Sequence, residues 1–204
     1  MCYNYITVLK NIKQVLLIRG ENMEKRIAEA VLEEIKIHGF KFTMDDITAR
    51  LHMSKSSLYK LVGSKDKLVH DVISFIKEDF EAQKRQLLAE ETDRYSKICR
   101  FIELYVEIFR PYNNNIYKEI KLLYYAEWER WQQFQQENVD CLLQLLQDGI
   151  NAGEFRKVNI RVVRQIVLTA AIAMTDYQFL QENNLTYYDA LETLSDLIFN
   201  GLKK

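Results

Sequence analysis

The sequence predicts an all-α fold in which a small N-terminal helix-turn-helix unit precedes a larger helical domain. Helix breakers are scarce, with one Pro and six Gly in 204 residues, while Leu, Glu, Lys, Gln and Ala dominate long tracts. Apolar residues recur three or four positions apart through most of the chain, which is the spacing of one helix face. The length suits one or two domains with a sizeable core. We place an N-terminal extension at 1–22, the helix-turn-helix unit at 23–68 and the helical domain at 69–204.

The first twenty-two residues allow two interpretations. Their short apolar run, VLLI, has no small-residue cleavage pattern after it, which argues against a signal peptide. The segment Arg19-Gly20-Glu21 could be encoded by a purine-rich ribosome-binding sequence just before Met23, so 1–22 could be a translated leader from a mis-assigned start. The rival interpretation is an amphipathic N-terminal helix that packs on the body of the protein or lies over DNA.

An opening helix is expected over 26–39, and a second helix begins after Thr43. Thr43 can cap this second helix, and Asp46 stands three residues later, close to the pattern of a capping box. Ile47 and Leu51, four residues apart, give the helix one apolar face.

A tight turn and a short recognition helix follow. His52-Met53 makes the turn, because histidine tolerates the left-handed conformation better than β-branched residues do. Ser54 caps a helix over 55–62 whose first residues are small or basic, which suits close approach of a helix N-terminus to the major groove. Ser64 then caps a further helix.

Charge is local rather than general. The formal net charge is −1, so an evenly basic, nonspecific binder of polyanions is not expected. Five basic side chains nevertheless stand between positions 50 and 67 against Asp66 alone: Arg50, Lys55, Lys60, Lys65 and Lys67. A confined basic patch beside a helix-turn-helix fits a specific DNA reader, and a solvated charged surface is the plainer alternative.

Residues 26–68 resemble the DNA-binding unit of the TetR family of bacterial transcriptional regulators. The matching positions after the opening helix are Phe40, Thr43, Asp46, Ile47, Ser54, Lys55, Leu58, Tyr59, Ser64, Lys65 and Leu68. Thr48, His52 and Val62 depart from the family pattern of Ala, Gly and an aromatic residue. The resemblance implies base contacts by Lys55, Ser56 and Ser57. It also implies contacts with the DNA backbone by Thr43, Tyr59, Lys60 and Lys65.

The remaining helices are expected at 64–89, 98–109, 116–152 with room for one break, 159–183 and 186–202. Pro111 ends the second of these, and Gly153 is the expected C′ residue of the third, in a phrase, DGINAGEF, that resembles the end of a long TetR helix.

The last two helices are the expected dimer interface, with an ordinary intrachain hairpin as the alternative. Their small and apolar residues allow close helix approach, and two-fold symmetry is the usual means of reading a palindrome. The expected dimerisation residues are Val163, Val167, Ala170, Met174, Leu191, Leu194 and Ile198.

Aromatic residues concentrate between 101 and 134 and could line an apolar pocket with hydrogen-bonding groups. The alternative is plain core packing. The expected ligand-binding residues are Tyr105, Phe109, Tyr124, Trp128 and Trp131.

The sequence predicts no cofactor, metal site or catalytic centre. Three well-separated cysteines and three histidines lack metal-ligand spacing, and no Ser-His-Asp set or phosphate-binding loop is visible. No apolar run is long enough to span a bilayer, so a cytoplasmic location is expected. The predicted function is a ligand-responsive repressor that binds a palindromic operator in double-stranded DNA as a homodimer. A protein-partner adaptor on the same fold, or a small-molecule enzyme, remains as an alternative.

Overall fold

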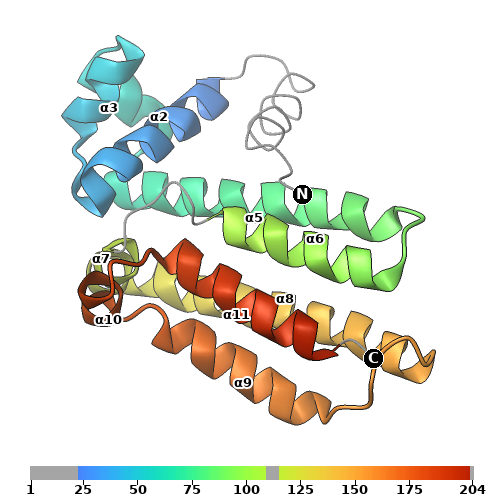
Figure 1. Cartoon of the computed structure of the whole chain (residues 1–204). Coiled ribbons are helices and arrows are strands. Elements are labelled where there is room, and N and C mark those ends of the chain that lie inside the picture. The colour runs from blue at the N-terminus through green and yellow to red at the C-terminus, as the bar shows by residue number, and fades with distance from the viewer. Residues whose placement is uncertain (1–22, 109–114, 203–204) are drawn as a thin grey trace. The chain divides into compact units, whose positions relative to one another are not determined.

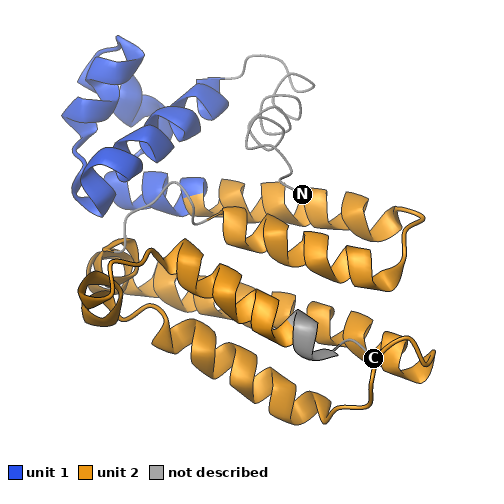
Figure 2. Cartoon of the chain, viewed as in Figure 1, with its two compact units in different colours: residues 1–72 blue, residues 73–204 orange. Residues whose placement is uncertain are grey.

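The computed structural model describes residues 23–108 and 115–202, and within these ranges it contains helices and no strand (Figure 1). The all-α class is confirmed. The chain divides into two compact units, residues 1–72 and 73–204 (Figure 2), whereas the sequence placed the boundary after Leu68. The observed boundary lies inside helix α5 (Lys65–Ala89).

The described part of unit 1 consists of α2 (Met23–His38), the 3-10 turn η1 (Gly39–Lys41), α3 (Met44–Leu51), α4 (Lys55–Val62) and the start of α5. Helix α2 packs against α3, and α3 packs against α4. The buried apolar core takes residues from every one of these segments: Ile27, Val31, Ile35, Phe40, Phe42, Ile47, Leu58, Leu68 and Val69.

Unit 2 contains the rest of α5 and six further helices in the described ranges. They are α6 (Arg94–Glu107), α7 (Ile116–Leu123), α8 (Tyr125–Asn151), α9 (Ile160–Ala173), α10 (Tyr177–Glu182) and α11 (Tyr187–Leu202). Helix α8 packs against α6, α7 and α9, which agrees with the central position expected from its apolar content. None of the described helices combines the length and the apolar character that a membrane span requires.

Two glycines shape the end of α8. A Cβ on Gly149 would lie 2.2 Å from the ring of Phe155, so only glycine lets this buried ring pack against the helix. Gly153 has a φ of +76°, directly after the C-cap Ala152, and is therefore the predicted C′ residue. The chain then turns back, and Phe155 joins a core cluster with Ile98, Leu143 and Leu146.

Two of the predicted helices, 116–152 and 159–183, are each divided into two helices in the structure. The tract 116–152 breaks once, at Tyr124, whose φ and ψ of −140° and 61° separate α7 from α8. The single helix predicted over 159–183 is wrong, because α9 ends at Ala173 and α10 begins at Tyr177. Asp176 causes the restart, since its side chain accepts the backbone N–H groups of Gln178 and Phe179. The predicted stop at Pro111 lies outside the described residues.

Candidate nucleic-acid interface and ligand cavity

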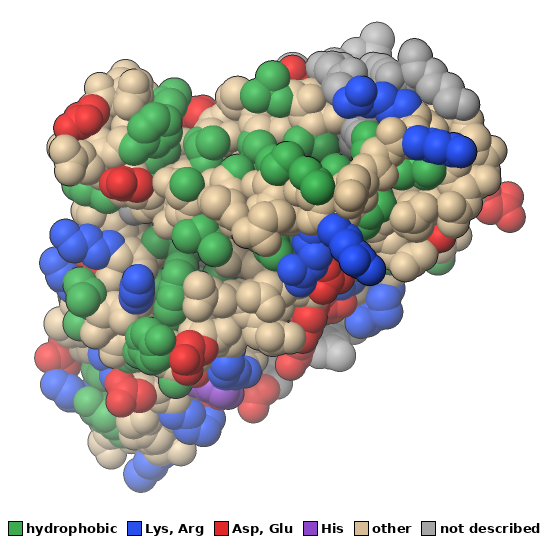
Figure 3. Space-filling view, turned by 90° about the horizontal axis from the view of Figure 1, so that it is seen from below, with side chains coloured by type: hydrophobic (Ala, Val, Ile, Leu, Met, Phe, Trp, Pro, Cys, Tyr) green, Lys and Arg blue, Asp and Glu red, His purple; other side chains and the backbone are tan. Residues whose placement is uncertain are grey.

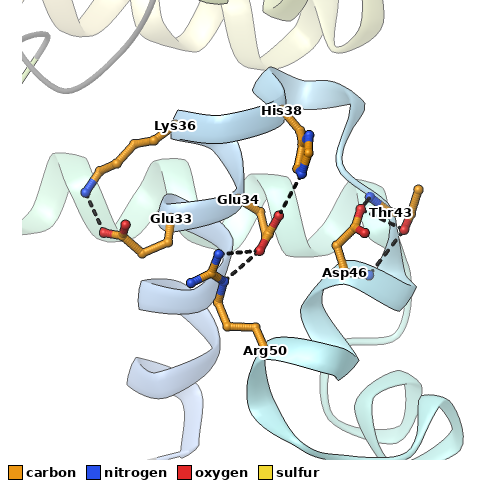
Figure 4. Close-up of polar contacts among 7 residues, drawn as sticks. All are labelled: Glu33, Glu34, Lys36, His38, Thr43, Asp46 and Arg50. Carbon is orange, nitrogen blue, oxygen red and sulfur yellow. Dashed lines mark hydrogen bonds and ion pairs between the residues drawn. The ribbon is translucent and has the colours of Figure 1, made fainter.

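The first helix of the helix-turn-helix begins at a complete capping box. The Thr43 backbone N–H donates to the Asp46 carboxylate at 2.7 Å, and the Asp46 backbone N–H donates to the Thr43 hydroxyl at 3.2 Å (Figure 4). The hydrogen bonds from Thr43 lower the pKa of Asp46 below its ordinary value. The expected cap is confirmed, and it fixes where α3 starts.

The turn that joins α3 to α4 depends on a left-handed residue. His52 has a φ of 54°, and the N–H of Met53 donates to the carbonyl of Thr48 at 3.1 Å. Thr48, the other departure from the TetR pattern in this region, donates its hydroxyl to the carbonyl of Asp45 at 2.9 Å. Both departures therefore fit the turn without loss of its hydrogen bonds.

Helix α4 presents one buried and one exposed side. Leu58 and Val62 are buried in unit 1, and the predicted cap is present, because Ser54 accepts the N–H of Ser57 at 3.1 Å. The remaining residues of this helix are exposed to solvent: Lys55, Ser56, Ser57, Tyr59, Lys60 and Leu61. All five predicted DNA-contact residues of α4 are therefore on its solvent side, as a helix that enters a groove requires.

Lys55 has a partner within the unit. Its ammonium lies 2.9 Å from the carboxylate of Asp45 on α3, and this hydrogen bond raises the pKa of Lys55. Both side chains are more than half exposed, so water competes for the pair and the ammonium can exchange Asp45 for a phosphate or a base edge at little cost.

Lys65 is held differently from the other predicted DNA contacts. It is half-buried, donates to the carbonyl of Phe40 at 2.8 Å, and its ammonium lies 4.4 Å from the centre of the Phe42 ring. This lysine thus ties the start of α5 to Phe40 in η1 and to Phe42 directly after it. Thr43, the other predicted backbone contact outside α4, is exposed at the N-cap of α3.

A buried carboxylate joins α2 to α3 (Figure 4). The Glu34 side chain is only 7% exposed, and its carboxylate accepts from Nε and Nη2 of Arg50, each at 2.6 Å. Nε2 of His38 lies 3.5 Å from the same carboxylate. Sequence reasoning missed this cluster and placed Arg50 in the basic patch. A signal was present, because Glu34 falls on the same helical face as Ile27, Val31 and Ile35.

Unit 2 contains a cavity of about 230 Å³ between α6, α8, α9 and α11. Most of its wall is apolar. Its polar lining residues are Tyr105, Gln132, Gln135, Gln136, Asn138, Gln165, Thr169 and Ser195. Burial raises the pKa of the Tyr105 phenol well above its ordinary value, and a hydrogen bond with Gln135 partly opposes this rise.

Of the predicted ligand-binding residues that the structure describes, only Tyr105 lines the cavity. Tyr105 lines the cavity, whereas Tyr124, Trp128 and Trp131 are not among its lining residues and Phe109 lies outside the described ranges. Trp128 is buried with its ring centre 5.9 Å from that of Tyr117, and Trp131 packs on Phe134 at 5.2 Å.

Most of the predicted dimerisation residues lie on the sides of α9 and α11 that face the cavity of unit 2. Five of them line the cavity: Val163, Val167, Leu191, Leu194 and Ile198. Ala170 on α9 and Met174, the C-cap residue of that helix, are half-buried. Four other large apolar residues of these two helices are more than half exposed: Val162, Ile166, Ile172 and Leu197. Helix α9 belongs to the face shown in Figure 3, where apolar side chains gather.

This architecture, an N-terminal helix-turn-helix with a C-terminal helical domain, is that of the TetR-family transcriptional regulators. The solved structures with this fold include PfmR from Thermus thermophilus, with a TM-score of 0.62 and 22% identity over 88% of this chain and 100% of that one. A TetR transcription regulator from Haloarcula marismortui has a TM-score of 0.70 and 16% identity over 89% and 98% of the two chains.

The chain is also similar to a curated bacterial protein along nearly its whole length. It is 27% identical over 181 residues to YvaF of Bacillus subtilis, an uncharacterized HTH-type transcriptional regulator, and the match covers 88% of this chain and 95% of that protein. No family model matches the chain. Together these similarities support a DNA-binding transcriptional regulator as the general class.

Proposed function

We propose that the protein is a transcriptional regulator that binds a palindromic operator as a homodimer and is released from it by a small molecule. The observation that carries the proposal is the exposed side of α4. Lys55, Ser56 and Ser57 stand at the N-terminal end of this helix, backed by buried Leu58 and Val62. A helix end with small and basic side chains and free N–H groups suits base edges and phosphates in the major groove.

The proposed contacts divide into two kinds. Lys55, Ser56 and Ser57 would meet base edges, whereas Thr43, Tyr59, Lys60 and Lys65 would hold the phosphate backbone. The Asp45 carboxylate competes with DNA for Lys55, because it lies 2.9 Å from the ammonium in the free protein. Binding to a site that offers Lys55 a hydrogen-bond acceptor is therefore favoured over binding to a site that does not.

The dimer is proposed from the apolar outer side of α9 and α11. Val162, Ile166 and Leu197 are 52%, 53% and 67% exposed, which leaves an apolar surface that a second copy can cover. An isologous contact of this kind pairs the surface with itself and presents two copies of α4 to two half-sites.

Release by a ligand would start in the cavity of unit 2. The Phe80 ring of α5 packs on the cavity residues Phe101 and Tyr105, with 5.9 Å between ring centres in each case. Helix α5 contributes residues to both units, so a change in its position on ligand binding would reach the DNA-binding unit through one continuous helix. A ligand acts in this way only if its affinity differs between the DNA-bound and the free conformation. By linkage, the ligand weakens operator binding by the same factor by which the operator weakens ligand binding.

The test is selection of DNA by the purified full chain from a random library, followed by gel shift with the enriched sequence and with DNA from upstream of the gene. We expect an enriched two-fold symmetric sequence that binds far more tightly than scrambled DNA. Enrichment of no sequence, together with equal binding to all DNA, would refute a sequence-specific regulator and favour the adaptor alternative.

A further inference from the structure

The wall of the cavity in unit 2 carries no formal charge. Its described lining residues include apolar side chains, three glutamines on α8, one asparagine, one tyrosine and two hydroxyl residues, with a further glutamine on α9, but no Asp, Glu, Lys, Arg or His. The Tyr105 phenol also stays protonated, because burial raises its pKa well above the ordinary value. A charged group inside the cavity would therefore meet dipoles but no opposite charge.

Two nearby cations, Lys84 and Arg164, are each paired with a carboxylate. Lys84 donates to the side-chain oxygen of Asn138 at 2.8 Å, but its ammonium also lies 2.5 Å from the Glu81 carboxylate. Between α8 and α9, Arg164 forms a two-point contact with Asp140 at 2.6 and 3.2 Å. Neither pair leaves a net charge for a ligand.

The buried polar groups are partly used within the protein. Asn138 donates to the carbonyl of Phe134 at 2.8 Å and accepts from Lys84, and Ser195 donates to the carbonyl of Leu191 at 2.8 Å. Gln136, Gln165 and Thr169 are exposed and Gln132 is half-buried, so these side chains can reorient toward a ligand. The wall thus offers a few neutral donors and acceptors in an apolar surround.

The volume limits the size of the occupant. A cavity of about 150 Å³ lined by aliphatic and aromatic side chains binds benzene, which has six carbons. By proportion, a cavity of about 230 Å³ holds about nine non-hydrogen atoms.

We propose that this cavity binds an uncharged, mainly apolar molecule of about nine non-hydrogen atoms and discriminates against organic anions and cations of the same size. The physical reason is that an ion taken out of water is stabilised only by a counter-charge or a full set of hydrogen bonds, and the wall supplies neither. The inference rests on the proposed function only in treating this cavity as the effector site.

Three probes with one chain and three charges test the inference: 1-octanol, octanoate and octylammonium. Their binding to the full chain is measured by titration calorimetry at pH 7. We expect 1-octanol to bind at least about tenfold more tightly than either ion, because the effective penalty for an unpaired buried ion exceeds the free energy of one tenfold step. Octanoate should gain affinity as the pH falls toward its own pKa, since the neutral acid is the species that the cavity accepts.

A pair of substitutions on neighbouring residues places the binding in this cavity. Gln132 lines the cavity, whereas Gln133 is exposed and donates to Glu137 on the same helix. Gln132→Lys adds a counter-charge to the wall and should shift the preference toward octanoate by at least about tenfold, whereas Gln133→Lys should leave the ratio unchanged. Gln132→Met, which adds no charge, should keep the preference for 1-octanol and shows whether position 132 tolerates substitution.

Equal affinities for the three probes, no binding of 1-octanol, or the same ratio in both lysine variants would overturn the inference. Operator binding without any probe is measured on the same samples. If operator binding is intact while the probe series fails, only the ligand class is wrong. If operator binding is absent from the wild-type protein, the proposed function itself is wrong.

Discussion

Replacement of Arg50 by Met should loosen the joint between α2 and α3 far more than replacement of its partner Glu34 by Gln. The asymmetry follows from burial, because the Glu34 side chain is 7% exposed and that of Arg50 is 37% exposed. Arg50→Met leaves a carboxylate buried without its guanidinium, which costs about 3–5 kcal/mol when one partner of a buried pair is removed. Glu34→Gln leaves Arg50 with access to water and with an amide oxygen as acceptor, so only a charge-assisted hydrogen bond is weakened, at about 1–2 kcal/mol.

Hydrogen exchange of the amides in α2 and α3 measures this effect locally, without requiring two-state unfolding of the whole chain. For Arg50→Met we expect exchange to accelerate by more than about a hundredfold, since each tenfold step corresponds to about 1.4 kcal/mol. The double variant should lose less than the sum of the two single variants.

Glu33→Gln is the matched control. Glu33 neighbours Glu34 but is exposed, and it pairs with Lys36 at 2.5 Å on the helix surface (Figure 4). Its replacement should change exchange by no more than a few-fold. If Glu33→Gln and Arg50→Met have equal effects, or if Glu34→Gln is the more damaging change, the pair does not hold α2 to α3.

Three further outcomes are expected. Ile166→Glu places a charge on the exposed apolar side of α9 and should convert the dimer into a monomer of 24.3 kDa, as measured by light scattering. The control Gln144→Glu, at an exposed position of α8, should leave the dimer intact, and a monomeric wild type would contradict the proposed interface. Lys65→Ala removes the hydrogen bond to the Phe40 carbonyl and should lower the free energy of unfolding of unit 1 by about 1–2 kcal/mol. It should also weaken binding to all DNA, and an unchanged stability would argue against that hydrogen bond. The pKa of Asp46, measured by NMR, should lie below its ordinary value of 3.8. The stability that its capping hydrogen bonds contribute is therefore present above pH 3.8 and is lost as the pH falls through the lower folded-state pKa. A titration midpoint above 3.8 would contradict the capping geometry.

Local signals in the sequence sufficed for the helix-turn-helix. Each of its caps and its turn depends on residues within four positions of one another, so they can be predicted from the local sequence. These features are the caps at Thr43 and Ser54 and the left-handed turn at His52. The break at Asp176 had the same kind of signal, because an Asp side chain can accept the backbone N–H groups two and three residues later. The apolar residues on both sides were nevertheless continuous enough to suggest one helix.

The face that α9 turns toward its own unit could not be read from periodicity. Apolar residues stand in adjacent pairs, Val162-Val163 and Ile166-Val167, which gives the helix two apolar stripes. Periodicity defines both stripes but does not say which of them packs inside the unit, because that depends on the shape of the neighbouring helices. Val163 and Val167 line the cavity, while Val162 and Ile166 remain exposed.

The cavity could not be placed from aromatic content for a related reason. Aromatic side chains supply surface, but a void exists only where packing leaves one, and sequence spacing carries no information on gaps. Trp128 and Trp131 fill their own surroundings through contacts with Tyr117 and Phe134, whereas the cavity is lined mainly by aliphatic residues and amides.

The ratio of affinities for operator and scrambled DNA, measured by fluorescence anisotropy for the wild type and for Ser57→Ala and Lys60→Ala, tests the central claim most directly. We expect a wild-type ratio of at least about a thousandfold at physiological salt. Ser57→Ala should reduce this ratio, because Ser57 is proposed to meet base edges. Lys60→Ala should instead weaken both DNAs alike and flatten the salt dependence by about one unit. A wild-type ratio near one, or identical behaviour of the two variants, would contradict sequence reading by α4.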